Sequence, residues 1–235
     1  MAYVIEKRLM SGLPNVRLDS VKYVIAHESG NSKNCGPDAL ENEIAYMNRN
    51  KANAFTSHWV GGGGRIVHVA PVGKVQYGCG PKGNPYSYAQ VELARTSDKE
   101  QFKKDYAAYI WLLRELAKEA GIPIVLDGAG NGIKSHRWIT DNLKGTTHRD
   151  PYDYLASMGI SEAQFRIDIL KGLLKEEEKG LQITEAKVML NDTKTIPAMI
   201  VDGRTYVQVR ELADLLNLKL VYNDESKIAK LYEVK

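Results

Sequence analysis

The chain has 235 residues, enough for one medium domain with a small one, or for one large domain. Its 43% hydrophobic and 26% charged residues are ordinary for a globular protein. The formal net charge of +3 is too small for a typical nucleic-acid binder, so no nucleic-acid partner is expected. Cys35 and Cys79 are too few for a disulfide scaffold and lack CxxC spacing, which predicts two reduced, part-buried thiols.

The sequence shows neither a secretory signal nor a membrane span. Its start, MAYVIEKRLM, lacks the basic region followed by an apolar run that a signal peptide needs. No stretch approaches the ~20 apolar residues of a membrane-spanning helix. We therefore expect synthesis in a cytoplasm without a signal peptide, and no membrane insertion. The mildly basic charge suits an enzyme that approaches an anionic polymer such as a cell wall.

Strand and helix patterns alternate over residues 1–174. Apolar, β-rich runs predict strands over 21–27, 54–60, 65–71, 91–95 and 122–125. Apolar residues at helical spacing predict helices over 39–50, 98–121 and 160–174. The expected N-caps of these helices are Asp38, Ser97 or Asp98, and Ser161. This alternation favours an α/β fold with a mixed central β-sheet flanked by helices.

Glycine-rich and turn-rich segments separate these elements. Gly61 to Gly64 joins two predicted strands and indicates a hairpin, because a phosphate cradle needs a helix directly after the glycines. Residues 78–88 form a loop too long for a simple turn, and such loops are more often functional. Residues 127–132, DGAGNG, lack the rest of a calcium-loop pattern and are interpreted as a surface turn. Residues 134–155 are turn-rich.

A change of composition marks a second domain. The charged run KEEEKG predicts a linker over 175–181. Beyond it, β-rich segments surround one short helical segment, and Asp202-Gly203 is a tight-turn signal. We expect a small α+β domain over 182–235, with the order strand–strand–helix–strand–strand, attached to a larger domain over 1–174.

The residues with metal-binding chemistry all lie in the larger domain. The five histidines are His27, His58, His68, His136 and His148, and Asp150 closely follows the last of them. A catalytic zinc site uses three imidazole, carboxylate or thiolate ligands and leaves one position for water. His27, His136 and Asp150 would meet this need. Five histidines offer many other triples, however, so spacing alone does not select this one.

The order and context of these residues resemble a known enzyme family. The resemblance covers about residues 18–170 and is carried by YVIAHESG, ENEIAYM, FTSHWVGGGGRIVHVAP, YGCG with QVELA, SHRW and THRDPYDYL. These segments resemble those of the type-2 zinc-dependent N-acetylmuramoyl-L-alanine amidases, which include many phage endolysins and share a fold with peptidoglycan recognition proteins. The resemblance implies that one Zn²⁺ is bound by His27, His136 and Asp150, and that Glu92 is the catalytic carboxylate.

The sequence departs from this family pattern near the third ligand. The gap from His136 to Asp150 is longer than in compact members of the family, which indicates an inserted loop. His148 stands where many relatives carry a Lys that stabilises the oxyanion. His148 would take that role if protonated, or it would compete with Asp150 for the metal. The Asp-Pro pair at 150–151 favours Asp150 as the ligand.

The resemblance also implies a reaction. The substrate would be bacterial peptidoglycan, cleaved at the amide between the lactyl group of N-acetylmuramic acid and L-alanine. Zinc would polarise the carbonyl and lower the pKa of water from ~15.7 toward ~7. Glu92 would move a proton from water to the departing amine, and His148 would help to stabilise the oxyanion.

Four further side chains are expected to line the substrate groove: His58, Tyr77, Tyr86 and Trp138. For His58 a packed position is an alternative, and aromatic residues at such places are as often part of a core. His68 falls within a predicted hairpin strand and is expected at the surface. Two other functions remain open, namely a non-catalytic peptidoglycan-recognition module and a cytoplasmic muropeptide-recycling amidase.

The C-terminal region carries a resemblance of its own. IPAMIVDGRTYVQVRELADLLNLKLVYND resembles the small repeat named after the N-terminal domain of copper amine oxidases. Residues 182–235 contain no His or Cys, so copper is not expected there. The resemblance implies attachment to the cell wall, and a dimerisation or stability module is the alternative. Release through a holin pore is implied only by the likeness to endolysins.

Overall fold

The computed structural model describes residues 3–173, 184–190, 194–201, 204–207, 209–223 and 228–233. The chain divides into two compact units, Met1–Leu173 and Leu174–Lys235. The linker expected over 175–181 and the turn expected at Asp202-Gly203 lie outside the described residues.

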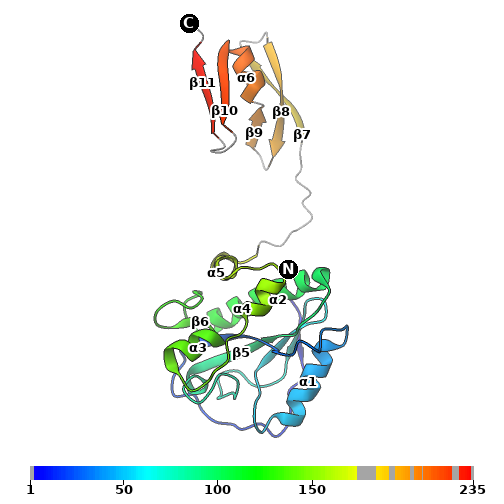
Figure 1. Cartoon of the computed structure of the whole chain (residues 1–235), viewed down its shortest axis with the longest axis vertical. Coiled ribbons are helices and arrows are strands. Elements are labelled where there is room, and N and C mark those ends of the chain that lie inside the picture. The colour runs from blue at the N-terminus through cyan, green and yellow to red at the C-terminus, as the bar shows by residue number, and fades with distance from the viewer. Residues whose placement is uncertain are drawn as a thin grey trace. The chain divides into compact units, whose positions relative to one another are not determined.

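A six-stranded mixed sheet forms the centre of the first unit (Figure 1). Its strands are β1 (Ile5–Lys7), β2 (Tyr23–Glu28), β3 (His58–Gly61), β4 (Arg65–His68), β5 (Ser87–Leu93) and β6 (Gly132–Ser135), in the order β1-β4-β3-β5-β2-β6. Strands β3, β5, β2 and β6 run parallel to one another, whereas β4 is antiparallel to β3 and β1 is parallel to β4. Together with its flanking helices, this sheet confirms the predicted α/β class.

Side-chain alternation gives the sheet two different faces. On one face, Val91 and Leu93 of β5 pack against α2 (Lys99–Glu119) in the main core. On the other face, α1 (Ala39–Asn50) covers Trp59 of β3, and α3 (His136–Leu143) covers Ile25 of β2. Since β5 lies between β3 and β2, its side chains on this second face project between the two helices.

The predicted helices of the first unit are largely confirmed. Asp98 accepts hydrogen bonds from the N–H groups of Glu100 and Gln101 and so caps α2. Ser161 caps α5 (Glu162–Lys171) in the same way. Asp38 is the N-cap residue of α1, as predicted, but its side chain makes no capping hydrogen bond.

The run of four glycines is a hairpin turn, as expected. Gly62, Gly63 and Gly64 have φ angles of 61°, 88° and 92°, which favour glycine. Asp105 of α2 accepts hydrogen bonds from the N–H groups of Gly63 and Gly64, at 2.8 and 2.5 Å. The turn between β3 and β4 is therefore tied to the helix that covers the main core.

Several short elements differ from the predictions. Residues 122–125 form no strand. Ile122 packs into the main core, and Leu126, just beyond this segment, makes an isolated bridge with Ile133. The turn-rich segment contains β6, α3 and α4 (Tyr152–Ser157), and β1 was not predicted. Strand β5 begins at Ser87, after a short 3₁₀ helix at Asn84–Tyr86, instead of at Val91. Such short elements depend on pairing with distant strands more than on local sequence.

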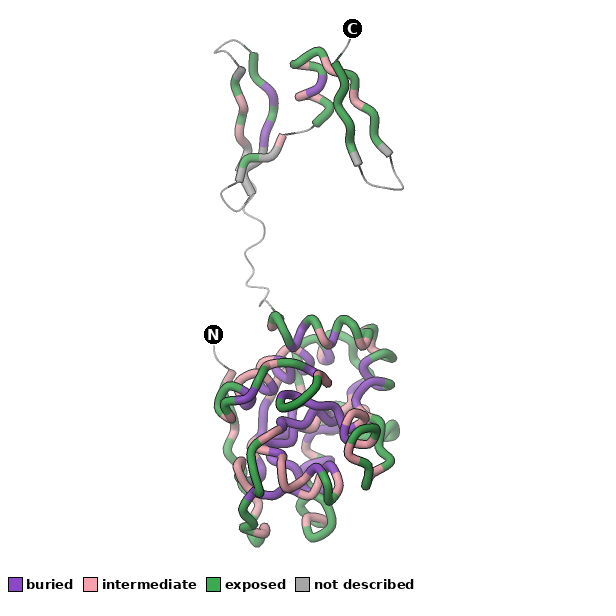
Figure 2. Tube along the Cα trace, turned by 90° about the vertical axis from the view of Figure 1, so that its left-hand side faces the viewer, coloured by how far each residue is buried: buried purple, intermediate pink, exposed green. Residues whose placement is uncertain are grey.

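The second unit has more strands than expected. Strands β7 (Thr184–Leu190), β8 (Lys194–Val201) and β9 (Arg204–Val207) form an antiparallel sheet, α6 (Val209–Leu215) follows, and β10 (Leu218–Asn223) pairs with β11 (Ile228–Glu233). Three strands thus precede the helix where two were predicted. Figure 2 shows buried residues gathered mainly in the first unit. Across the described residues, none of the helices combines the length and the apolar character that a membrane crossing requires.

Candidate metal centre

Three neighbouring parallel strands bring polar residues to one edge of the sheet. His27 lies near the end of β2 and pairs in register with Glu92 of β5. Strand β6 ends at Ser135, so the next residue, His136, begins α3 at the same edge. The carboxyl ends of parallel strands commonly carry sites for this reason.

His27, His136 and Asp150 form a cluster whose potential ligand atoms all lie within 4.8 Å of one another. Asp150 Oδ2 lies 3.1 Å from His27 Nδ1, and Asp150 Oδ1 lies 3.1 Å from His136 Nδ1. The two imidazole rings meet edge to face, with centroids 4.7 Å apart. Two imidazoles and one carboxylate are the donor set of a zinc site that keeps a fourth position open. The residues present therefore fit a zinc ion.

The segment that carries His136 is anchored by the loop expected to be a surface turn. The carboxylate of Asp127 accepts hydrogen bonds from the backbone N–H of Ser135 (2.7 Å) and from its hydroxyl (2.8 Å). The Tyr152 hydroxyl donates to the same carboxylate. Asp127 thereby joins the start of α3, just before His136, to the helix that follows Asp150.

Each histidine of the cluster has a second polar partner on its other ring nitrogen. His27 Nε2 lies 3.0 Å from Gln90 Oε1, and His136 Nε2 lies 3.0 Å from Thr146 Oγ1. Sequence reasoning missed both partners. The sequence could have predicted that Gln90 lies on the same face as Glu92, because residues two positions apart on a strand point to the same face. Thr146 lies in a loop and has no such signal.

Glu92 is held in an environment that disfavours its charged form. Its Oε2 atom is buried and has no hydrogen-bond partner in the structure. Burial raises the pKa of Glu92 to about 8, against the opposing effect of the neighbouring His27. A divalent cation bound nearby would favour the ionised carboxylate.

The three residues of the cluster shift one another's pKa values. Burial disfavours the Asp150 carboxylate, but hydrogen bonds with His136 and His27 hold its pKa below the ordinary value. Burial lowers the pKa of His136. Burial also disfavours charged His27, but Glu92 and Asp150 outweigh it and raise its pKa to about 9. Metal binding at His27 would therefore release a proton.

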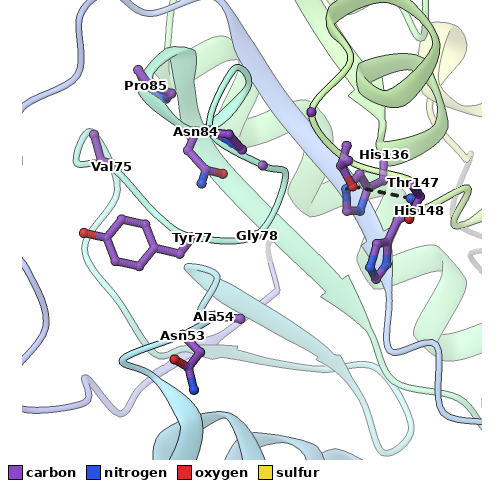
Figure 3. Close-up of a pocket in the computed structure, with 14 residues that line it drawn as sticks. Asn53, Ala54, Val75, Tyr77, Gly78, Asn84, Pro85, His136, Thr147 and His148 are labelled. Carbon is purple, nitrogen blue, oxygen red and sulfur yellow. Dashed lines mark hydrogen bonds between the residues drawn. The ribbon is translucent and has the colours of Figure 1, made fainter.

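A groove of about 1000 Å³ opens beside the cluster (Figure 3). Asn53, Tyr77 and Asn84 lie on one side of it, and His136 and His148 lie on the other. The rest of its lining consists of Ala54, Val75, Gly78, Gly80, Pro81, Pro85, Gly145, Thr146 and Thr147. The groove therefore presents amide, hydroxyl and imidazole groups and no carboxylate or ammonium group.

His148 stands at the rim of this groove, outside the three-residue cluster. Its side chain is 71% exposed and its Nδ1 lies 4.0 Å from Asp150 Oδ1. Its ring stacks on that of His136, with centroids 4.9 Å apart. His148 is thus close enough to act on a bound substrate but makes a weaker contact with Asp150 than the two buried histidines.

Of the four expected groove residues, the structure brings only Tyr77 to the groove. Tyr86 and Trp138 pack beside Ile25 in a small core cluster and are absent from the groove lining. His58 pairs with Val91 and so points to the α2 face, away from His27. The sequence could not decide this, because the face of His58 depends on which strand β3 pairs with, and in which register.

His58 has instead a structural environment next to His68. The two rings stack with centroids 4.4 Å apart. The ring nitrogen Nδ1 of His58 lies 3.0 Å from the Ser57 hydroxyl, and burial lowers the pKa of His58 to about 3. His68 is half-buried instead of exposed as expected, and its Nε2 atom is buried without a hydrogen-bond partner.

Comparisons with known proteins agree with this geometry. An endolysin of Listeria phage A511 is 54% identical over 173 residues, which cover 72% of this chain and 50% of that protein. A lytic amidase of Streptococcus pneumoniae phage HB-3 is 43% identical over 171 residues, covering 71% of this chain and 52% of that protein. The chain thus spans about half the length of these curated relatives.

Solved structures share the fold of the first unit. A Staphylococcus aureus hydrolase, AmiA, solved in complex with its ligand, matches with a TM-score of 0.65 and 26% identity over 72% of this chain and 83% of that one. The structure of PlyL matches with a TM-score of 0.54 and 19% identity over 73% of this chain and 99% of that one, a likeness of fold alone. A family profile described as N-acetylmuramoyl-L-alanine amidase matches residues 17–153. This chain therefore belongs to the N-acetylmuramoyl-L-alanine amidase family.

Proposed function

We propose that the chain is a zinc-dependent, endolysin-type peptidoglycan amidase, which cleaves the amide between the lactyl group of N-acetylmuramic acid and L-alanine. The observation that carries the proposal is the convergence of His27, His136 and Asp150 at the sheet edge that also carries buried Glu92. Family membership supports the reaction, and relatives named endolysin and lytic amidase support the cell wall as its target.

One Zn²⁺ would be held by His27, His136 and Asp150, and it supplies Lewis acidity and a lowered pKa for water. Asp150 is a better third ligand than His148, because its two oxygens already contact both buried imidazoles at 3.1 Å. His148 is largely exposed and remains available to the substrate.

Glu92 would serve as the general base and then the general acid. Its buried Oε2 lacks a partner, and buried polar groups normally have one, so an attacking water is a fitting donor to it. A cation held at the cluster would favour the ionised carboxylate, which would then accept the proton of the water and pass it to the departing amine. Such proton transfer typically contributes about 10²–10⁴ in rate.

The groove residues would bind and orient the substrate. His148 at the rim would donate a hydrogen bond to the tetrahedral oxyanion, a contribution whose loss typically lowers the rate by about 10²–10³. Asn53, Asn84 and Thr146 offer amide and hydroxyl groups to the N-acetyl and peptide groups of peptidoglycan. Tyr77 offers a ring face to a sugar or an alanyl methyl group.

The test is digestion of purified bacterial cell walls by the full chain. We expect new L-alanine amino termini to appear, a chelator to abolish their release, and added zinc to restore it. Release that continues in the chelator would refute the metal-dependent mechanism. Wall binding without release would indicate a recognition module, and cleavage restricted to soluble anhydro-muropeptides would indicate a recycling amidase.

Residues 182–235 would attach the enzyme to the wall, in keeping with their resemblance to the small repeat of wall-associated proteins. The enzyme would be made in the cytoplasm of a phage-infected host and reach the wall with the help of a holin. The route through the host cytoplasm and a holin rests on the resemblance to endolysins. Truncation after residue 173 tests the attachment to the wall.

A further inference from the structure

We propose that Gln90 is a positioning residue of the metal centre, which orients His27 and keeps its Nδ1 atom available to the metal. The inference rests on the proposed zinc site and deepens it. Its starting observation is that His27 contacts two different side chains through its two ring nitrogens. Nδ1 lies 3.1 Å from Asp150 Oδ2 on the metal side, and Nε2 lies 3.0 Å from Gln90 Oε1 on the other side.

The position of the Gln90 oxygen determines which nitrogen of His27 carries a proton. A neutral imidazole has a single N–H group, and an amide oxygen accepts but does not donate. With Oε1 at Nε2, the proton of the neutral ring remains on Nε2 and the lone pair of Nδ1 faces Asp150 and His136. Metal-binding histidines are commonly oriented by an acceptor at the second nitrogen in this way.

The hydrogen-bond network identifies which end of the Gln90 amide faces His27. The Gln90 NH₂ group donates to the backbone carbonyl of Gln76 and to Asn84 Oδ1, both at 3.3 Å. Asn84 Oδ1 is itself identified as an oxygen, because it accepts the backbone N–H of Cys79 at 2.9 Å. Rotating the Gln90 amide by half a turn would place its oxygen against two acceptors, so only one orientation is satisfied.

The backbone of Gln90 is held as firmly as its side chain. Its N–H group lies within hydrogen-bond distance of both Ser57 Oγ (3.1 Å) and Gln76 Oε1 (3.0 Å). Its carbonyl accepts from the N–H and the hydroxyl of Ser57. The residue is fully buried, so water does not compete for its amide. A strand fixed in this way holds the orienting amide at Gln90 and the catalytic carboxylate at Glu92 on the same face.

Gly78 leaves the space that the Gln90 oxygen occupies. A Cβ atom at Gly78 would lie 2.3 Å from Gln90 Oε1 and 2.8 Å from Thr56 Cγ2, both closer than real Cβ contacts. The requirement for glycine here is spatial. Gly78 and Asn84 also line the groove, so the amide network borders both the groove and the metal cluster.

The first experiment replaces Gln90 by Met in the full chain and measures zinc affinity by competition with a chelator. We expect Gln90→Met to bind zinc about 10–100-fold more weakly than the parent chain, the usual effect of removing such a partner. The visible absorption of bound cobalt should also change, since it reports the geometry of the ligands. Tyr106→Phe is the matched control, because it removes a buried hydrogen bond to Asp168 within the main core. That variant should lose stability and keep the zinc affinity and the cobalt spectrum.

Two further variants separate orientation from a general loss of packing. Gly78→Ala displaces the Gln90 oxygen without altering Gln90, and it should weaken zinc binding. Its control is Gly61→Ala, whose new Cβ would lie 2.8 Å from Ala94 Cβ, a comparable clash that does not involve Gln90.

The outcomes distinguish this inference from the proposed function. A parent chain that binds no zinc would refute the zinc site itself. A parent chain that binds zinc, with Gln90→Met and Gly78→Ala matching it in affinity and cobalt spectrum, would overturn the role of Gln90 alone. If Gln90→Met fails to fold by circular dichroism, Gly78→Ala compared with Gly61→Ala decides the question by the same two measurements.

Discussion

Strand β5 presents Val91 and Leu93 to one face of the central sheet and Gln90 and Glu92 to the other. The first face is closed by the long helix α2 and consists of buried apolar side chains. The second face is covered by α1 over β3 and by α3 over β2, and polar side chains of β5 project between these helices. The same strand thus supports stability on one side and the proposed chemistry on the other. Substitutions of adjacent residues on β5 should therefore affect different properties of the protein.

Two histidine pairs illustrate the difference. His27 and His136 lie 4.7 Å apart by ring centroids, and His58 and His68 lie 4.4 Å apart. Only the first pair has a carboxylate, Asp150, completing a metal-binding group among the described residues. In the second pair, burial lowers the pKa values of both rings, and the opposing effect of Glu119 on His68 does not overcome it. The presence of an adjacent acid, more than ring proximity, separates a candidate metal centre from a packed pair.

The largest expected effect is the loss of zinc binding and activity on substitution of His27, compared with substitution of His58. His27→Ala should lower zinc affinity by more than the ~10–100-fold typical of an outer partner, because it removes a ligand. Wall hydrolysis should fall to the background rate. His58→Ala should keep zinc and turnover while lowering the melting temperature. Zinc content, release of amino termini and thermal unfolding measure these changes. A His27→Ala variant that binds zinc and remains active would refute the assignment of His27 as a metal ligand.

A second substitution tests the chemistry of the groove face without touching the ligands. Glu92→Gln should reduce kcat by about 10²–10⁴, since it removes the proton acceptor. It should retain zinc and lose no stability, because the Glu92 carboxylate is buried with an unpartnered oxygen. The surface carboxylate of Glu119 gives the matched control, Glu119→Gln, for which unchanged kcat is expected. Full activity in Glu92→Gln would remove Glu92 from the mechanism.

Substitutions on the core face should lower stability and leave turnover unchanged. Leu113 of α2 is fully buried in the main core. Leu113→Ala should lower the free energy of unfolding by about 2–5 kcal/mol, through lost burial and the cavity left behind. Denaturant titration measures this loss. The kcat of the folded variant should equal that of the parent chain. A large fall in kcat under conditions in which the variant is fully folded would show that the core face also affects the chemistry.

A smaller effect is expected from the pH dependence of stability. Burial raises the pKa of Asp105 from 3.8 to about 6, despite its hydrogen bonds from Gly63 and Gly64. Between about pH 4 and 6 the unfolded chain has released this proton and the folded chain retains it, so this group lowers stability as the pH rises. Asp105→Asn removes the contribution. The melting temperature of the parent chain, relative to the variant, should therefore fall from pH 4 to 6, and parallel profiles would refute the assignment.

The smallest effect on turnover is expected from removing the second unit. The cluster, Glu92 and the groove all come from residues before 151. A chain truncated after residue 173 should hydrolyse soluble muropeptides at the parent rate. Its sedimentation with purified walls should decrease if the second unit is a wall-binding domain. Unchanged sedimentation would favour the dimerisation or stability role instead.

The sequence alone determined the features that depend on local interactions. The apolar stripe and the Asp98 cap predicted α2, and the continuous apolar run ending in His27 predicted β2. The glycine run predicted the hairpin between β3 and β4. In each case the determining contacts lie within a few residues along the chain, so that pattern and propensity suffice.

Only the tertiary structure decided which distant residues meet. The face of His58 depends on the register of β3 against β5. The short strand β6 and the position of His136 depend on pairing with β2 and on the Asp127 anchor. The contact of Gln90 with His27 requires two strands far apart in the chain to lie side by side. Such long-range pairings arise from packing of the whole sheet, and no local sequence signal encodes them.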